Sequence, residues 1–228
     1  MNKRAPEKMR FAALATDVVL CTVLDEKLKV LLMQIDLPPH YKNTWALPGS
    51  LIRPNETAID TAKRLLADKA KIDPKHAYLE QLYTFSRIDR DPRNRVVSVA
   101  YLGLIPGSRA AIYERSWPKN MKWCDIEKIP SLAYDHTDMA RTAVERLKSK
   151  IAYTNIAFGM MPEQFTLTEL QELYEAILNK ELDKRNFRRK VIDIGLIETV
   201  KNKITGVAHR PALLYRFKSK KSQIIDVL

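Results

Sequence analysis

Basic side chains at helical spacing mark the segment from 184 to 190, which reads KRNFRRK. An arginine guanidinium can contact a phosphate, or it can form two parallel hydrogen bonds to a guanine edge in the major groove of DNA. Between Lys184 and Lys221 there are twelve lysines and arginines against two acids, Asp193 and Glu198. This composition favours a polyanionic partner and predicts contact with the phosphates and bases of a nucleic acid.

Two helices joined by a short turn are expected to position these cations. The first helix, over 166–178, begins with a capping-box pattern in which Thr166 caps the free amides and Glu169 reaches back. Asp183 can cap the second helix, and Gly195 suits the left-handed conformation that often follows a helix C-terminus. Such a pair, with cations on the exposed face of the second helix, is typical of a helix-turn-helix.

The same region predicts a core face and a wing. Phe187, Val191 and Ile194 share one side of the second helix and are expected to face a core. Strands over 197–200 and 213–217 flank a basic loop, as in a winged helix. The residues predicted to contact DNA are Lys184, Arg185, Asn186, Arg188, Arg189 and Lys190 on the helix and Lys201, Lys203, His209 and Arg210 on the wing. The alternative interpretation is a solvated, charged helix packed beside the preceding domain.

The overall composition limits the classes of protein that remain. Of 228 residues, 46% are hydrophobic, and the formal net charge is +12. No window approaches the roughly 18 consecutive apolar residues that a membrane span needs, and the basic N-terminus lacks the apolar run of a signal peptide. Cys21 and Cys124 lie in apolar neighbourhoods, which favours core packing over a disulfide or a metal site. We therefore expect a cytoplasmic protein with no membrane partner.

Upstream of about residue 155, strand-like and helix-like stretches alternate. Residues 17–23 and 28–33 are rich in Val and Leu around a polar turn and predict a hairpin, followed by a proline-containing loop. The remaining elements expected here are helices over 56–67 and 137–151, strands over 79–86 and 96–105, and a short strand after 117–123. We expect two domains, 1–154 and 155–228.

The stretch SLIRPNETAIDTAKRLLADKAKI, over 50–72, resembles the Nudix box. Glu56 and Arg64 keep their places in that pattern. The departures are Ser50 and Lys71 for the two glycines, Leu65 for the first glutamate of the Arg-Glu pair, and Asp68 and Lys69 for the two glutamates that follow.

These departures remove the chemistry of the box. In Nudix hydrolases the glutamates hold magnesium against a substrate diphosphate, and magnesium needs several hard oxygen ligands. Here one position is apolar and another, Lys69, carries a positive charge that repels the ion. We therefore expect no diphosphate hydrolysis, no metal and no cofactor.

Four further motifs resemble the Nudix-related transcriptional regulators of the NrtR family. The stretches 47–56 and 83–101 are similar to that family's loop before the box helix and to its central loop and strand. The stretches 182–190 and 210–217 resemble its recognition helix and wing strand. The resemblance covers nearly the whole chain and implies an α+β protein, with a Nudix α/β/α sandwich around a mixed sheet and a C-terminal winged helix-turn-helix.

The resemblance also implies a way of working. Members of the family are homodimers that bind a palindromic operator in double-stranded DNA, and a small effector that binds the Nudix domain releases the DNA. The effector is ADP-ribose in members that control NAD metabolism, and a sugar in members that control sugar catabolism. The resemblance thus implies a repressor, in which the effector favours the arrangement that does not bind DNA.

The predicted effector-binding residues are basic or acidic side chains around the box helix and in the charged loop after it. They are Arg53, Glu56, Arg64, Arg90, Arg93 and Arg95. Arg53 and Arg64 could meet a diphosphate and Glu56 a ribose hydroxyl. The alternative is that Arg64 and Glu56 pair with each other as a structural contact.

Two other functions stay open from the sequence alone. An active Nudix hydrolase of a nucleoside diphosphate derivative would depend on Glu56 and Asp68. A degenerate Nudix protein could also bind RNA or a protein partner through its basic face, with salt sensitivity but no sequence preference.

Overall fold

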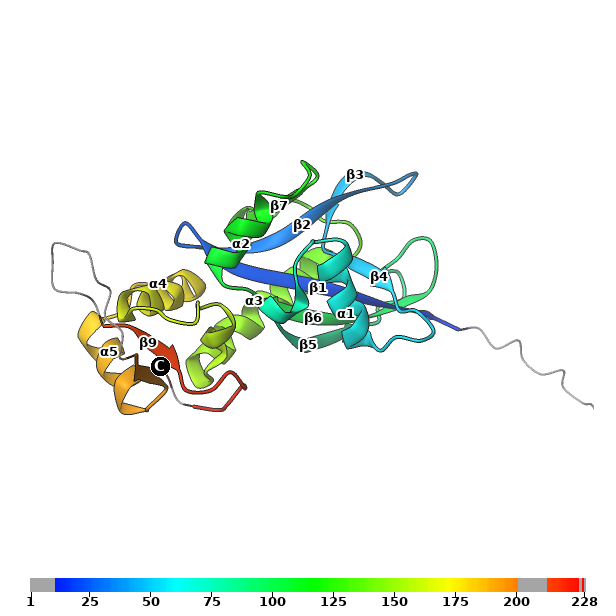
Figure 1. Ribbon diagram of the computed structural model, residues 1–228. Coiled ribbons are helices and arrows are strands. Elements are labelled where there is room, and N and C mark those ends of the chain that lie inside the picture. The colour runs from blue at the N-terminus through cyan, green and yellow to red at the C-terminus, as the bar shows by residue number, and fades with distance from the viewer. Residues whose placement is uncertain (1–10, 201–212, 226, 228) are drawn as a thin grey trace, which may run out of the picture.

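The computed structural model describes residues 11–200, 213–225 and 227, which form a body built around a sheet and a smaller, mainly helical body beside it (Figure 1). The strands are β1 (Ala13–Leu24), β2 (Lys27–Leu37), β3 (Tyr41–Ala46), β4 (Gly49–Leu51), β5 (Tyr78–Phe85), β6 (Val96–Leu104), β7 (Met121–Asp125), β8 (Ile197–Thr199) and β9 (Tyr215–Phe217). The helices are α1 (Ala58–Asp68), α2 (Gly107–Glu114), α3 (His136–Tyr153), α4 (Leu167–Leu178) and α5 (Lys184–Asp193), with 3-10 turns η1 (Pro74–His76), η2 (Ile126–Lys128) and η3 (Ile156–Gly159). The wing candidates Lys201, Lys203, His209 and Arg210 lie outside the described residues.

The large sheet is mixed, as the resemblance implied. Its main order is β3-β2-β1-β6-β5, with β4 paired to β1 and β7 paired to β2. In the described part of the chain β1 and β6 run parallel, and the other strand pairs of this sheet are antiparallel. The predicted hairpin of β1 and β2 turns at Asp25 and Glu26, which both have positive φ, as the tightest hairpin turns require.

Helices cover both faces of this sheet, which makes the predicted α/β/α sandwich. The central strand β1 alternates between two cores, because successive side chains of a strand point to opposite faces. Val18 and Leu20 pack in the core that contains the α1 residues Leu65 and Leu66. Val19 and Cys21 pack in the other core, which contains residues of α3 (Figure 1).

Two regions differ from the sequence-based expectation. The proline-containing loop contains β3 and β4, and helix α2 had not been expected at all. Strand β3 pairs only with the far end of β2 and exposes Lys42 and Asn43, so it lacks the apolar alternation that marks a strand. Helix α2 has no side-chain cap and buries only Ala110, so its sequence carries neither of the usual helix signals.

The C-terminal body has the predicted helix-turn-helix. The Thr166 hydroxyl accepts a hydrogen bond from the Glu169 amide at 3.2 Å, and the Glu169 carboxylate accepts one from the Thr166 amide at 2.6 Å. Asp183 caps α5 by accepting from the Asn186 amide at 2.8 Å. Gly195 ends it with φ 66°. The expected starts and end of these helices are therefore confirmed.

The core face of α5 and the strands of the wing are also as expected. Phe187 and Val191 are buried, and Ile194 packs partly buried against the same core. Strands β8 and β9 form a two-stranded antiparallel sheet, with Ile197 opposite Phe217.

The two bodies meet along α3, α4 and the C-terminal segment. The Ile225 amide donates to the Tyr153 carbonyl, and the Val227 amide donates to the Ala152 carbonyl, each at 2.8 Å. One continuous hydrophobic core runs from β1 and β2 through α3 into α4 and α5. The boundary expected after residue 154 falls at the end of α3 and stays a prediction.

Cys21 and Cys124 are both buried with free thiols, which confirms that they fill the core. No helix within the described ranges is long and apolar enough to span a membrane.

Candidate ligand pocket and nucleic-acid interface

A cavity of about 230 Å³ lies in the first body, where β1, β2 and β4 meet the loop between β5 and β6 and the residues at the start of α3. Apolar side chains form part of its lining, namely Ala15, Met33, Ile35, Leu37, Ala46, Leu47, Leu51 and Val96. The rest of the lining consists of Gly49 and of polar side chains, namely Asp17, Ser50, Lys69, Arg90, Asp91, Arg93, Tyr134 and His136. This mixture of apolar surface and a few convergent polar groups is typical of small-molecule sites.

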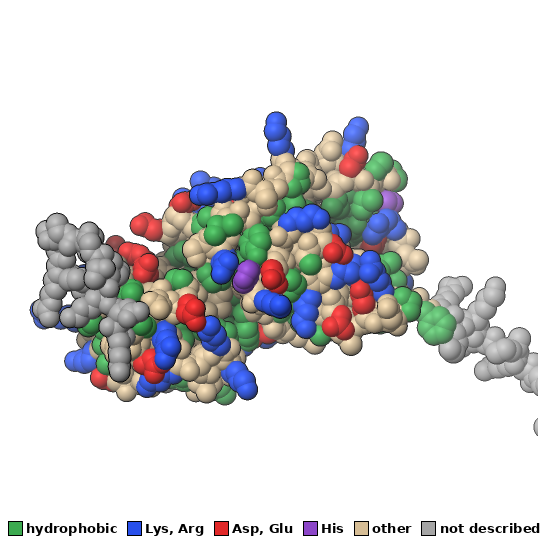
Figure 2. Space-filling model, viewed as in Figure 1, with side chains coloured by type: hydrophobic (Ala, Val, Ile, Leu, Met, Phe, Trp, Pro, Cys, Tyr) green, Lys and Arg blue, Asp and Glu red, His purple; other side chains and the backbone are tan. Residues whose placement is uncertain are grey.

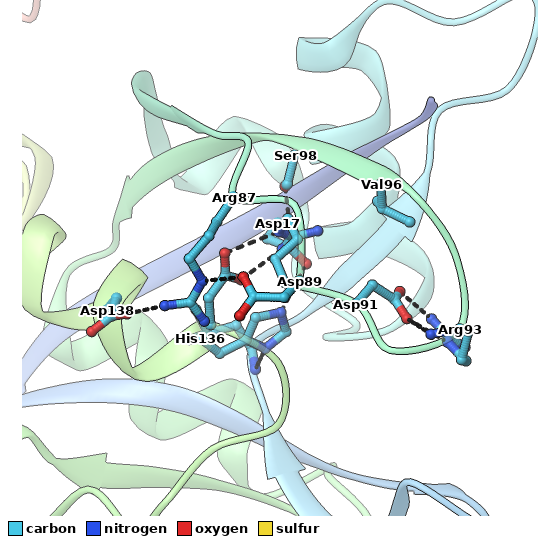
Figure 3. A network of polar contacts seen from close by, with 12 residues as sticks. Asp17, Arg87, Asp89, Asp91, Arg93, Val96, Ser98, His136 and Asp138 are labelled. Atoms are coloured by element: carbon cyan, nitrogen blue, oxygen red, sulfur yellow. Dashed lines mark hydrogen bonds and ion pairs between the residues drawn. The ribbon is translucent and has the colours of Figure 1, made fainter. Parts of the chain in front are cut away.

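Asp17 is the centre of a buried polar network beside this cavity (Figure 3). Its carboxylate accepts a hydrogen bond from Ser98 Oγ at 2.6 Å and faces Arg90 Nη2 at 3.4 Å. Arg90 also donates through Nε and Nη2 to the two carboxylate oxygens of Asp135, at 3.0 and 2.8 Å. Arg90 is therefore a buried structural cation that ties the β5–β6 loop to β1 and to the start of α3.

His136 completes this network in one defined tautomer. The Leu47 amide donates to its Nδ1 at 2.9 Å, so the neutral ring carries its proton on Nε2, which faces Asp17 Oδ1 at 3.4 Å. Burial raises the pKa of Asp17, but its interactions with His136, Ser98 and Arg90 outweigh burial, and the net result is a lowered pKa. Asp17 is therefore held as a carboxylate.

Arg93 lies in the same loop and is paired locally. Its Nε and Nη2 donate to the carboxylate of Asp91 at 3.0 and 2.8 Å, and its guanidinium lies 5.3 Å from the ring centroid of Tyr134. The hydrogen bond with Asp91 raises the pKa of Arg93. Tyr134 adopts φ 56°, and burial raises the pKa of its hydroxyl. Arg93 remains about half exposed, at 47% of its side chain.

The structure forms the internal pair between Glu56 and Arg64 that the sequence left as an alternative. Arg64 Nε and Nη2 donate to the two oxygens of Glu56 at 2.6 and 2.8 Å, and Thr61 Oγ1 donates to Glu56 at 2.9 Å. These bonds, with that of Arg64 first, lower the pKa of Glu56 to about 2. Arg53 is exposed and approaches Glu56 at 3.6 Å.

The predicted effector-binding residues are thus divided by the fold. Arg90 and Arg93 line the cavity, whereas Arg53, Glu56, Arg64 and Arg95 do not. Arg95 donates instead to the backbone carbonyl of Arg87 at 3.2 Å. An effector-binding role for any of these six residues stays a prediction.

Lys69 lines the cavity, although the sequence analysis had treated it only as a lost metal ligand. It is exposed as a residue, yet its Nζ reaches inward and donates to the Gly49 carbonyl. Partial burial of the ammonium group lowers the pKa of Lys69, and the negative charge of Asp17 opposes that shift. The place of Lys69 at the C-terminal end of the box helix could have indicated that it lies near the ligand pocket.

The box residues do not fit a magnesium site. Leu65 is fully buried in the core, Glu56 is bonded to Arg64, and Lys69 brings a cation to the pocket. Among the described residues no group of three or more His, Cys, Asp or Glu side chains is arranged to hold a metal ion. A divalent cation here would have too few oxygen ligands and a charged neighbour.

Helix α5 presents most of its predicted DNA-contacting side chains on the outside of the second body, and Figure 2 shows basic side chains at this end of the molecule, interspersed with acidic and neutral ones. Lys184, Arg185, Asn186 and Arg189 are exposed, and Arg188 and Lys190 are half-buried. Arg188 Nη2 donates to Thr168 Oγ1 at 2.8 Å, and Arg189 Nη2 donates to Asn186 Oδ1 at 3.1 Å. Both of these partners are neutral, so within the described ranges neither guanidinium charge is neutralised by a carboxylate.

Comparisons with known families agree with this division of the chain. A family model described as the NUDIX domain matches residues 14–147, and one described as the NrtR DNA-binding winged helix domain matches residues 157–217. The class is therefore that of proteins with a Nudix domain followed by a DNA-binding winged helix.

Relatives along the whole chain narrow this class. The chain is 37% identical over 209 residues to the ADPR responsive transcriptional repressor NtrR of Acinetobacter baylyi, covering 90% of this chain and 81% of that protein. It belongs to the NrtR family of Nudix-related transcriptional regulators. The predicted family, fold and general function as a DNA-binding regulator are confirmed at this level.

Solved structures of a family member are similar in both domains. NrtR of Shewanella oneidensis in complex with a 27mer DNA has 36% identity and a TM-score of 0.78, covering 90% of this chain and 93% of that one. The NUDIX domain of the same protein in complex with ADP ribose has 32% identity and a TM-score of 0.50, covering 63% of this chain and 94% of that one.

Proposed function

We propose that this protein is a cytoplasmic transcriptional repressor that leaves its operator when ADP-ribose binds the Nudix pocket. In this proposal residues 1–154 are the sensor and residues 155–228 bind DNA as one half of a homodimer on a palindromic site. The observation that carries it is the cationic face of α5, where Arg188 and Arg189 are bonded, among the residues that the structure describes, to the neutral side chains of Thr168 and Asn186. A helix of this kind, following a capped first helix, suits insertion into the major groove.

ADP-ribose is favoured over a sugar as the effector because an ADPR responsive repressor resembles this chain over 90% of its length, and the similar NUDIX domain of another relative was solved with ADP ribose. The pocket itself is compatible with a phosphate-bearing ligand, because it combines cations with apolar surface. Genes of NAD metabolism are the corresponding targets.

Diphosphate hydrolysis is not part of this proposal. The Leu65, Asp68 and Lys69 positions do not supply the carboxylates that a magnesium-dependent hydrolase needs. Incubation of the protein with ADP-ribose and magnesium is expected to release no AMP. Release of several AMP molecules per protein molecule would show that the protein is a hydrolase.

The first experiment is selection of binding sites from a random pool of duplex DNA at physiological salt. Enrichment of one palindromic sequence is expected, since a symmetric dimer reads two equivalent half-sites. The selected duplex then serves as the probe, and ADP-ribose is expected to release it whereas free ribose is not. Binding without sequence preference would contradict the regulator and favour a general polyanion-binding surface.

A further inference from the structure

Three cations line the Nudix pocket, and two of them are already paired with acids. Arg90 holds Asp135 at 2.8 Å and faces Asp17 at 3.4 Å, and Arg93 holds Asp91 at 2.8 Å. Each guanidinium therefore meets a carboxylate inside the protein before any ligand arrives. A bound phosphate would have to compete with these internal acids for the same N–H groups.

Lys69 is different because its ammonium contacts a neutral group. Its Nζ donates to the backbone carbonyl of Gly49, and within the described ranges no carboxylate lies at ion-pair distance from it. An ammonium has three N–H donors and one is used here, so two remain for a ligand. Its exposed stem also leaves the side chain room to turn toward a ligand in the cavity.

The charge balance of the pocket depends on this lysine. The two arginines face three carboxylates, those of Asp17, Asp91 and Asp135, which by themselves leave one net negative charge. Lys69 brings that balance to zero. Without it a diphosphate would meet a lining with a net negative charge, which would weaken its binding because like charges repel.

We propose that Lys69 binds the diphosphate of the effector directly, and that its fixed positive charge makes effector binding independent of magnesium. This inference rests on the proposed function. Lys69, whose charge disfavours magnesium at the Nudix box, would thus supply the positive charge that magnesium would otherwise provide. Arg90 and Arg93, by contrast, would shape the pocket and hold its loop.

The test is calorimetric titration of the full-length protein with ADP-ribose, once with magnesium and once with excess EDTA. The unaltered protein is expected to bind equally well in both. Lys69→Met is expected to bind roughly 10- to 100-fold more weakly in both, the usual effect of removing a hydrogen bond to a charged group. Lys69→Arg, which keeps the charge, should lose less than Lys69→Met.

Lys63→Met is the matched control, because Lys63 is exposed on the same helix and does not line the cavity. It should bind ADP-ribose like the unaltered protein. Unchanged melting temperature and operator affinity would show that Lys69→Met is folded.

The outcomes separate the two proposals. If the unaltered protein binds no ADP-ribose in either buffer, the proposed function fails and takes this inference with it. If it binds but requires magnesium, or if Lys69→Met binds as tightly as the unaltered protein, only the role of Lys69 is overturned.

Discussion

Arginines in two regions of this molecule do different work. In the loop between β5 and β6, Arg90 is bonded to Asp135, which the fold brings to it, and Arg93 is bonded to its near neighbour Asp91. On α5, Arg188 and Arg189 are bonded to a threonine hydroxyl and an asparagine amide oxygen. The sequence shows the same residue type in both places, but only the second pair keeps its charge for a partner.

The difference teaches how a basic segment should be interpreted. Cations bonded to internal acids order a loop and define a pocket, and their removal should damage the fold. Cations bonded to neutral groups are held in position while their charge stays uncompensated, and their removal should damage binding. Each of the following predictions tests one side of this contrast.

The largest effect is expected from Asp135→Ala, which takes away the main carboxylate partner of the buried Arg90. Leaving a buried charge without its partner costs about 3–5 kcal/mol. Unfolding in urea should show this loss of stability. Asp138→Ala is the matched control, because Asp138 lies in the first turn of α3, three residues after Asp135 at the N-cap, and pairs with exposed partners. Equal stability of the two variants would mean that the arginine is not held as described.

A smaller effect, on binding alone, is expected from changing Arg188 and Arg189 together to Ala. Each lost arginine contact to a guanine or phosphate costs about 1–3 kcal/mol, so operator affinity should fall roughly a hundredfold. The dependence of binding on salt should weaken at the same time. The melting temperature should stay close to that of the unaltered protein.

The control for this pair is Arg109→Ala with Arg115→Ala, two exposed arginines of the first body. This double variant has the same net charge as the α5 variant. If both lose operator affinity equally, net charge and not the position on α5 determines binding.

The smallest effect is expected from the pair of Glu56 and Arg64 at the edge of the box. The pKa of Glu56 is about 2 in the fold, below its ordinary value of 4.5, so its contribution to stability is present above about pH 4.5. That contribution is lost as the pH falls toward 2. Glu56→Gln should therefore melt slightly lower than the unaltered protein at pH 6, with the difference shrinking below about pH 4.5 and disappearing toward pH 2. A constant difference across this range would argue against the charged pair.

Local signals in the sequence were enough to predict the helix-turn-helix. Thr166, Glu169, Asp183 and Gly195 act within a few residues of their positions, so their hydrogen bonds and backbone angles follow from the order of residues. The same holds for strand β1, whose run of Val and Leu residues is buried on both faces of the sheet. The box helix could be placed for similar reasons.

The partners of the pocket residues could not be predicted in this way. Arg90 meets acids 45 and 73 positions away, and these contacts exist only after the sheet and α3 have packed together. The inward turn of Lys69 toward Gly49 likewise depends on where β4 lies against α1. The sequence analysis therefore grouped six charged residues as effector-binding candidates, whereas only Arg90 and Arg93 of these line the cavity.

The continuous core that joins β1 and β2 to α3, α4 and α5 has a consequence for engineering and evolution. The winged-helix domain is not an independently transferable module. Fusing it to another sensor domain would expose apolar surface of Phe165, Leu170 and Tyr174 that is buried in this shared core. New specificities should therefore arise by substitutions within each domain that leave the shared core unchanged. Exchange of whole domains between family members should succeed only when the core residues on both sides of the domain contact are exchanged with them.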